Sequence, residues 1–299
     1  MEVSKLLRNN RLAQALMGIS ITEFNTILPV FSEALYTEMK LVKTKRKRAF
    51  GGGKKGALKT PEEKLAFILI FLKCYPTFDV LGFITNRDRT RACRSVHFLL
   101  KVMERALQKQ LVLPQRKIRS VEEFFSHFPE AKDVFVDGTE RRVEKPKNLK
   151  KRKKLYSGKK KATTRKTLVV TDEHKRILIM PPTKSGRRHD KRVLDKQQLV
   201  AMIPDDVALW GDTAFRGCER LHPNMCMPKK RTKLHPLTEE DKQHNRLISS
   251  IRILVEHALA GLKRFRAASD IYRHKLANAD DRFMLISAGL WNFHIQQTI

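Results

Sequence analysis

The chain has 299 residues and a large excess of basic side chains, 62 lysines and arginines against 31 aspartates and glutamates, for a formal net charge of +31. Such a charge attracts polyanions, so double-stranded DNA is the expected partner and an anionic membrane surface is the alternative. No apolar run reaches the ~18 residues of a membrane span, and the N-terminus lacks the apolar core of a signal peptide. These features predict no membrane insertion and a cytoplasmic, nucleoid-associated protein.

The four cysteines form no CxxC pair. Cys218, His222 and Cys226 are spaced four residues apart, which suggests a zinc site as one alternative. Structural zinc sites usually have a closer first pair of ligands and a clear second pair, so reduced cysteines without a metal are favoured.

Residues 1–59 predict a helical arm followed by a basic, glycine-rich linker. Ser20 and Glu23 form a capping-box pattern, and apolar residues follow it at helical spacing. Residues 43–59 contain eight basic residues, no acidic residue and three consecutive glycines. This composition predicts a flexible segment that either lies along a DNA backbone or is a solvated tether.

Residues 60–112 predict three helices in a helix-turn-helix arrangement. The cap pattern of residues 60–63 begins a helix that ends near Cys74, a short helix follows over residues 77–83, and a third helix begins after the polar turn 85–87. In such an arrangement the third helix enters the major groove of DNA. Four basic side chains lie around its N-terminal end: Arg87, Arg89, Arg91 and Arg94. Their charge favours DNA binding over an ordinary helical bundle.

The pattern changes after a connector, residues 113–130, in which Ser120 and Glu123 cap a short helix. Residues 131–299 combine short apolar runs typical of strands with helical patterns, and they predict an α/β domain with a central mixed sheet flanked by helices. The strand-like runs are Val134–Val136, Leu168–Val170, Ile177–Met180 and Val207–Trp210, and the helical patterns are 190–202, 239–266 and 280–296.

Two of these strands lead into an aspartate beside a glycine, Asp137 and Asp212. The helix predicted from residue 239 presents Arg252, Glu256 and Lys263 on one face, because offsets of four and seven residues align on a helix. Either the three side chains form an ion-pair stripe on the surface, or Glu256 is a metal ligand flanked by the phosphate-binding side chains of Arg252 and Lys263.

The chain resembles the bacterial insertion-sequence transposases of the DDE class, in the branch with a Harbinger-like endonuclease domain and an N-terminal helix-turn-helix. The resemblance extends over residues 60–295. It is carried in chain order by DGTERR at 137–142, YSGKKK at 156–161, GDTAFRG at 211–217 and SSIRILVEHALAGLKRF at 249–265. Residues 71–83 resemble the helix-turn-helix of that branch.

This resemblance implies a ribonuclease-H-like catalytic domain over residues 131–299, in which Asp137, Asp212 and Glu256 bind two Mg²⁺ or Mn²⁺ ions. Two such ions stabilise the attacking and leaving oxygens of phosphodiester cleavage and joining. A related group has the pattern Tyr-x2-Arg-x3-Glu-x6-Lys, and this chain has Ser249 at the tyrosine position. The rival interpretations are a non-catalytic DNA-binding protein derived from a transposase, and a metal-dependent nuclease without strand transfer.

Three further expectations concern the surroundings of these acids. Asp190 is either near the metal ligands or the N-cap of the following helix, and the N-cap is favoured. Residues 141–161 are strongly basic, and we expect Lys159, Lys160 and Lys161 to bind the DNA backbone. The family resemblance also implies a homo-oligomer on DNA.

Overall fold

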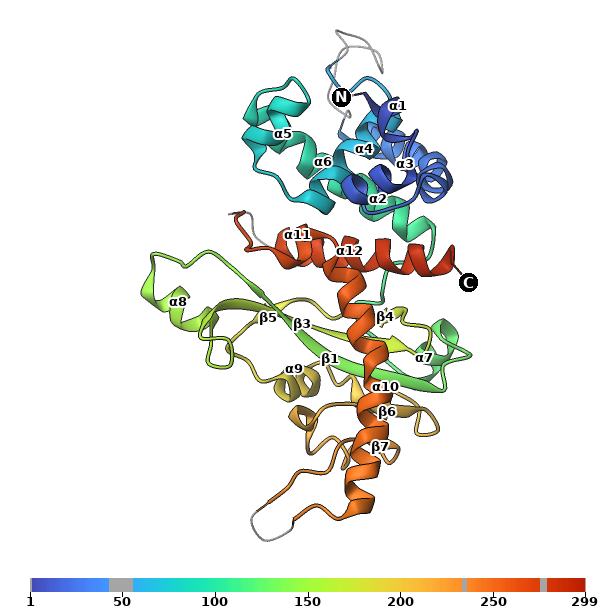
Figure 1. Cartoon of the computed structure of the whole chain (residues 1–299), viewed down its shortest axis with the longest axis vertical. Coiled ribbons are helices and arrows are strands. Elements are labelled where there is room, and N and C mark those ends of the chain that lie inside the picture. Colours follow the sequence, from blue (N-terminus) through green and yellow to red (C-terminus); the bar gives the residue numbers. More distant parts are fainter. Residues whose placement is uncertain (1, 43–55, 233–235, 275–278, 299) are drawn as a thin grey trace. The chain divides into compact units, whose positions relative to one another are not determined.

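The computed structural model describes residues 2–42, 56–232, 236–274 and 279–298 (Figure 1), so most of the predicted basic linker lies outside the described residues. The chain forms two compact units. A helical unit comprises residues 1–113, 262–270 and 282–299, and a sheet-containing unit comprises residues 114–261 and 271–281.

The helical unit is built from helices whose starts are capped as the sequence predicts. Ser20 N–H donates to Glu23 Oε2 at 2.5 Å and Glu23 N–H donates to Ser20 Oγ at 3.1 Å, and a second capping box begins at Thr60. The helices are α1 (Val3–Leu6), α2 (Asn10–Met17), α3 (Ile21–Val42), α4 (Pro61–Cys74), α5 (Phe78–Ile84), α6 (Arg89–Lys109), α11 (Arg266–Ser269) and most of α12 (Ala279–Gln296).

Helices α5 and α6 are joined by a tight turn. Asn86 has a φ of 51°, and Arg87 N–H donates to the Gly82 carbonyl at 2.8 Å. A Cβ at Gly82 would lie 2.6 Å from the Arg87 carbonyl oxygen, so the close approach of the two segments requires glycine. The predicted apolar face of α6 is buried, as shown by Val96, Leu99, Leu100, Met103 and Leu107.

Part of the C-terminal region belongs to the helical unit, whereas the sequence-based division placed all of residues 131–299 in the catalytic domain. The cause is the packing of α12. The Phe283 ring lies 5.7 Å from the Phe71 ring of α4, and a Cβ at Gly289 would lie 2.6 Å from Leu113 Cδ2. Local sequence patterns indicate that α12 is a helix, but they contain no information about which unit buries it.

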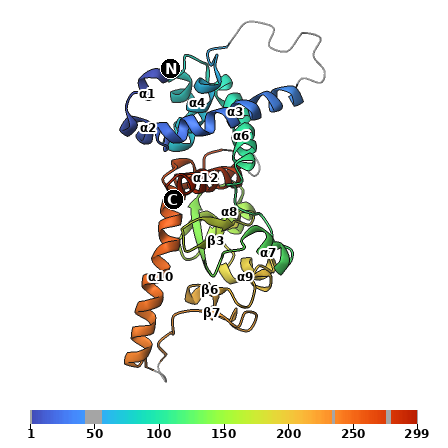
Figure 2. The ribbon, with the colours of Figure 1, turned by 90° about the vertical axis from the view of Figure 1, so that its right-hand side faces the viewer.

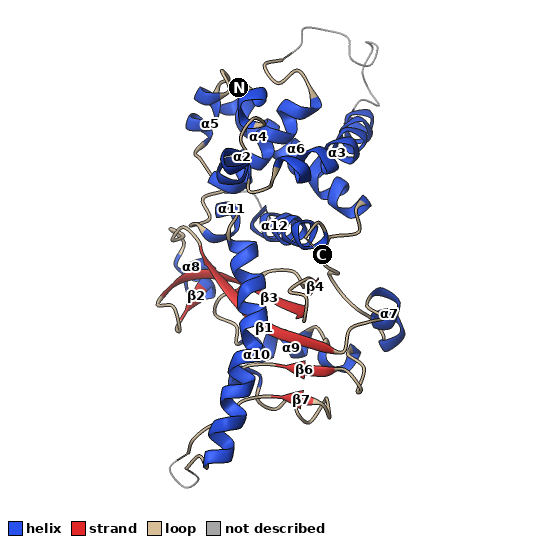
Figure 3. Cartoon of the chain, turned by 45° about the vertical axis from the view of Figure 1, so that its right-hand side comes forward, coloured by secondary structure: helices blue, strands red, loops and turns tan. Residues whose placement is uncertain are grey.

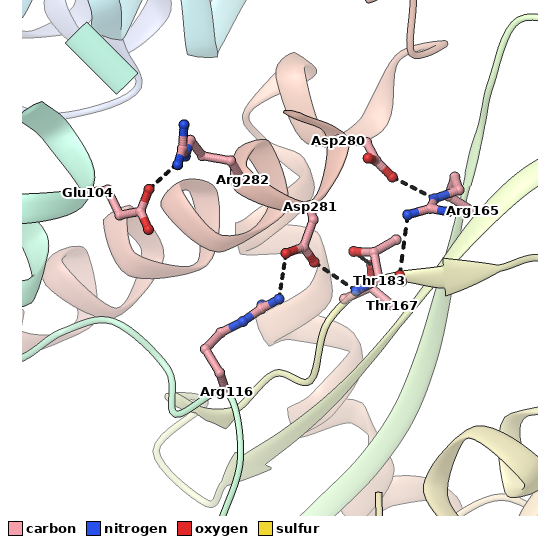
Figure 4. Close-up of polar contacts among 8 residues, drawn as sticks. All are labelled: Glu104, Arg116, Arg165, Thr167, Thr183, Asp280, Asp281 and Arg282. Atoms are coloured by element: carbon pink, nitrogen blue, oxygen red, sulfur yellow. Dashed lines mark hydrogen bonds and ion pairs between the residues drawn. The ribbon is translucent and has the colours of Figure 1, made fainter. Parts of the chain in front are cut away.

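The boundary between the two units falls between Asp281 and Arg282 of α12, whose polar contacts are drawn in Figure 4. On the sheet side, Asp280 accepts from Arg165 Nε at 2.7 Å, and Asp281 accepts from Arg116 and from the Thr183 backbone N–H at 2.5 and 2.7 Å. On the helical side, Arg282 pairs with Glu104 at 2.7 Å. The first turn of α12 is therefore anchored by charge-assisted hydrogen bonds.

The capping box of α3 also predicts how the stability of the helical unit depends on pH. Burial acts to raise the pKa of Glu23, but hydrogen bonds from His294 and Ser20 outweigh it and lower that pKa from 4.5 to about 2. Because the pKa is lower in the folded state, this stabilisation is present above pH 4.5 and is lost as the pH falls toward 2. We expect Glu23→Gln to lower the free energy of unfolding by about 3 kcal/mol at pH 6, and by much less at pH 3, in urea titrations.

The sheet-containing unit has a mixed sheet in the order β2-β3-β1-β6-β7 (Figure 3). β4 and β5 also pair with β3. The strands are β1 (Asp133–Arg142), β2 (Tyr156–Ser157), β3 (Ala162–Asp172), β4 (Ile177–Ile179), β5 (Lys184–Ser185), β6 (Ala208–Trp210) and β7 (Met225–Cys226). β1 runs antiparallel to β3 and parallel to β6. This confirms the expected α/β class, a mixed sheet flanked by helices as in ribonuclease-H-like domains.

Helices cover both faces of this sheet. Figure 2 shows α10 (Glu239–Lys263) on one side, and α7 (Val121–His127) and α9 (Asp190–Lys196) on the other. α8 (Leu149–Leu155) lies in the connection between β1 and β2. The helix predicted over 190–202 is wrong in its length: α9 ends at Lys196, since Gln198 has a φ of 50°, and only a 3-10 turn follows at Val200–Met202.

Among the described residues, no single helix has the length and apolar composition of a membrane span. α2 and residues Ile21–Leu41, bent by 57°, meet that criterion together by length and composition. Phe24, Ile27 and Phe31 of this pair are fully buried.

Candidate active site

Asp137 lies on β1, directly after the buried residues Val134–Val136. The prediction that the strand ends there is wrong, because pairing with β3 continues to Arg142. The Asp137 Oδ1 atom accepts from Gly138 N–H at 2.7 Å. Burial raises the pKa of Asp137, and the charges of Asp212 and Asp190 raise it further, against the lowering effects of Gly138 and Arg252. Burial is the main cause of this raised pKa.

Asp212 lies two residues after the end of the neighbouring strand, β6. β1 and β6 are parallel, with Phe135 opposite Trp210, and Asp137 and Asp212 each follow two residues later. The two aspartates are therefore presented by adjacent strands of the sheet. The Asp212 Oδ1 atom accepts from the N–H and hydroxyl of Thr213 at 2.6 and 3.2 Å. These bonds fix one carboxylate oxygen, while Oδ2 lies 3.9 Å from Arg252 Nη2.

Arg252 reaches these aspartates from α10. Its side chain is 19% exposed, and its Nε atom is buried without a hydrogen-bond partner in the part of the chain that the structure describes. The positive charge of Arg252 lowers the pKa of Asp137, and its guanidinium group contacts Asp212. Arg252 therefore offsets the repulsion between the two carboxylates. The structure thus brings Asp137, Asp212 and Arg252 together.

Glu256 follows Arg252 by one helical turn and is exposed. The structure does not bring it into one cluster with the two aspartates: within the described ranges, no group of three or more His, Cys, Asp or Glu side chains is arranged to hold a metal ion. Asp137 and Asp212 fit a divalent cation as oxygen ligands, because two coupled carboxylates gain from an added positive charge. Glu256 offers the same donor chemistry from the helix that carries Arg252.

Asp190 is not the N-cap of α9, so the favoured interpretation of this residue is wrong. His189 is the N-cap and Asp190 is the first helical residue. The Asp190 carboxylate instead pairs with Lys166 Nζ at 2.9 Å and lies beside Gly138. Sequence reasoning missed Lys166. The available signal was the adjacent pair Arg165 and Lys166 in the middle of a strand with one further charged residue, Asp172.

The predicted DNA-binding residues occupy several sites. Arg89 and Arg91 have 72% and 74% exposed side chains, Arg94 is exposed, and Arg87 donates to Ser95 Oγ at 2.7 Å. The remaining set is also exposed: Lys159, Lys160 and Lys161 in the turn between β2 and β3, and Lys263 at the end of α10.

The zinc alternative gains no support from the geometry. Cys218 is buried, and the buried His222 directs Nε2 to the Val207 carbonyl oxygen at 2.8 Å. All four cysteines are free thiols in the structure.

Comparison with known proteins gives two matches. The model of the family described as DDE superfamily endonuclease matches residues 136–292, which include both aspartates and Glu256. A protein of Microchaete diplosiphon, described as a probable transposase for insertion sequence element IS702, is 26% identical over 234 residues, covering 78% of this chain and 80% of that protein. No solved structure matches.

Proposed function

Since the chain belongs to the DDE superfamily endonucleases, we propose that it is a transposase that cleaves the ends of a mobile DNA element and joins them to target DNA. The observation that supports this proposal is the placement of Asp137 and Asp212. Each lies two residues after the last paired residues of the parallel strands β1 and β6, and Arg252 contacts Asp212. Such a pair provides anionic oxygens on a rigid element, as phosphodiester chemistry with divalent cations requires.

In this proposal Asp137, Asp212 and Glu256 would hold two Mg²⁺ or Mn²⁺ ions. When bound, the ions supply a nucleophile and neutralise charge that develops on the phosphate oxygens. The chain's own groups prepare the site. Gly138 N–H and Thr213 orient one oxygen of each aspartate, which leaves the other available to a ligand.

The proposal assigns recognition of double-stranded DNA to the helix-turn-helix of α4, α5 and α6, with α6 in the major groove. Its contacts are the four arginines near the start of α6, Arg87, Arg89, Arg91 and Arg94. Lys159, Lys160, Lys161, Arg252 and Lys263 bind the DNA backbone. The protein acts as a homo-oligomer on DNA, in the nucleoid of the cytoplasm.

A plasmid assay tests this function against both rivals. The full chain is incubated with supercoiled plasmid that carries the element ends and with Mg²⁺, and nicked, linear and joined products are separated. Cleavage at the ends followed by joining supports a transposase. Cleavage without joining identifies a nuclease, and binding without cleavage identifies a non-catalytic DNA-binding protein.

Arg252 provides a test of the electrostatics through the pH dependence of cleavage. The pKa of Asp137 is already raised, and Arg252 is one of the groups that lower it. Replacing Arg252 with methionine should raise that pKa further, so the carboxylate stays protonated to higher pH. We expect the acidic limb of the pH–rate profile to move to higher pH in Arg252→Met. An unchanged limb in a folded variant would contradict the role of Arg252 at Asp137.

A further inference from the structure

Lys166 is a buried cation that connects three segments of the sheet-containing unit. It lies on β3 directly opposite Glu140 of β1, and its side chain is 6% exposed. Its Nζ atom lies 2.9 Å from Asp190 Oδ1 and 3.3 Å from Glu140 Oε1, and it donates to the Arg188 carbonyl oxygen at 2.8 Å. A buried ammonium group is retained only when its partners compensate its desolvation. Lys166 therefore ties the start of α9 to β1 and β3.

The Asp190 carboxylate lies against the backbone next to Asp137. A Cβ built on Gly138 would be 2.8 Å from Asp190 Oδ1 and 3.2 Å from Asp190 Cγ. The backbone of Gly138 is not in the left-handed region. A side chain after Asp137 would have to displace the Asp190 carboxylate, which occupies that space. The charge of Asp190 also raises the pKa of Asp137, so the two groups are coupled electrostatically.

We infer that Lys166 is a positioning residue that holds the Asp190 carboxylate against Gly138, where its negative charge strengthens divalent-cation binding at Asp137. The inference rests on the proposed function, because it needs a cation at Asp137. Lys166, Glu140 and Asp190 together carry one net negative charge. The ion pair with Lys166 therefore holds Asp190 in place without cancelling the negative potential at Asp137. Groups behind a metal ligand typically change metal affinity by about 10- to 100-fold.

Mn²⁺ binding can be measured without any reaction. The chain has two tryptophans, and Trp291→Phe leaves Trp210, which is two residues from Asp212 and donates to Asp133 Oδ1 at 2.6 Å. In this full-length background we expect Mn²⁺ titration to change Trp210 fluorescence. Asp190→Asn and Lys166→Met should raise the Kd for Mn²⁺ about 10-fold, while Lys166→Arg restores most of the affinity.

Two further variants separate position from charge. Gly138→Ala retains every charge but displaces Asp190, so it should also weaken Mn²⁺ binding. Asp195→Asn is the matched control, since it removes an α9 carboxylate that pairs with Lys191 at 3.0 Å, and it should leave the Kd unchanged. Far-UV circular dichroism verifies folding, and if Lys166→Met is unfolded, Asp190→Asn and Gly138→Ala decide the question.

The outcomes also distinguish this inference from the proposed function. If Asp137→Asn abolishes Mn²⁺ binding while folded Asp190→Asn and Gly138→Ala bind like the parent, the positioning role is overturned and the proposed function stands. If the parent binds no Mn²⁺, or if Asp137→Asn binds it normally, the proposed metal site fails and the inference fails with it.

Discussion

Replacing Asp137 or Asp212 with asparagine, or Glu256 with glutamine, is expected to reduce DNA cleavage on the order of 10³-fold or more. Each substitution removes an anionic ligand but keeps the size of the side chain. Bound metal ions contribute several kcal/mol to stabilising transition-state charge, and each 1.36 kcal/mol corresponds to about tenfold in rate. DNA affinity should change little, because these carboxylates are not cationic phosphate contacts. Nicking of supercoiled plasmid and fluorescence anisotropy with labelled DNA measure the two properties separately.

The matched control for Glu256→Gln is Glu240→Gln, because both residues are exposed glutamates of α10. Glu240 lies in the first turn, sixteen residues before Glu256, and its substitution should retain full cleavage. EDTA should abolish DNA cleavage by the parent protein, and added Mg²⁺ or Mn²⁺ should restore cleavage. Full activity of Glu256→Gln would remove Glu256 from the ligand set and leave the proposal to Asp137 and Asp212.

Much of the fold is predictable because its signals are local. The cap residues Ser20 and Thr60 predict the helix starts correctly. The hydroxyl of each accepts a hydrogen bond from the backbone N–H three residues later, and this contact forms only at the first turn of a helix. The extension of β1 to Arg142 was not predictable, because its polar second half pairs with β3 across a connection of nineteen residues, 143–161. The left-handed backbone at Gln198 is equally invisible, since glutamine has no preference for that conformation.

The site residues also differ in whether local sequence patterns are enough to predict them. Asp137 and Asp212 could be predicted because an apolar run followed by Asp marks where a buried strand presents a carboxylate. Asp190 was misassigned because Asp at the start of a helix is a common cap, and only the tertiary structure shows its carboxylate on Lys166 and Gly138. The exposed position of Glu256 could not be predicted either, since helical periodicity aligns it with Arg252 without fixing its side-chain conformation.

DNA affinity of the full chain is expected to fall about 10³-fold or more between 50 and 200 mM salt if six or more phosphates are contacted. Within the described part of the chain, Arg89 and Arg91 pair with exposed carboxylates, Asp79 at 3.9 Å and Asp88 at 3.2 Å. Exposed pairs of this kind are weak, so both arginines can exchange them for phosphate oxygens at little cost.

The slope of log affinity against log salt reports the number of phosphate contacts, at about 0.9 for each phosphate on double-stranded DNA. The double substitution Arg91→Gln with Arg94→Gln should therefore lower the slope by up to about 2 and reduce the preference for element ends over random DNA. Arg8→Gln with Arg11→Gln removes the same charge from exposed positions of the same helical unit and is the matched control. If the control lowers the slope and the end preference as much as the α6 variant does, the effect is one of net charge and α6 is not the recognition helix. A loss of end preference confined to the α6 variant would assign sequence recognition to the N-terminal end of that helix.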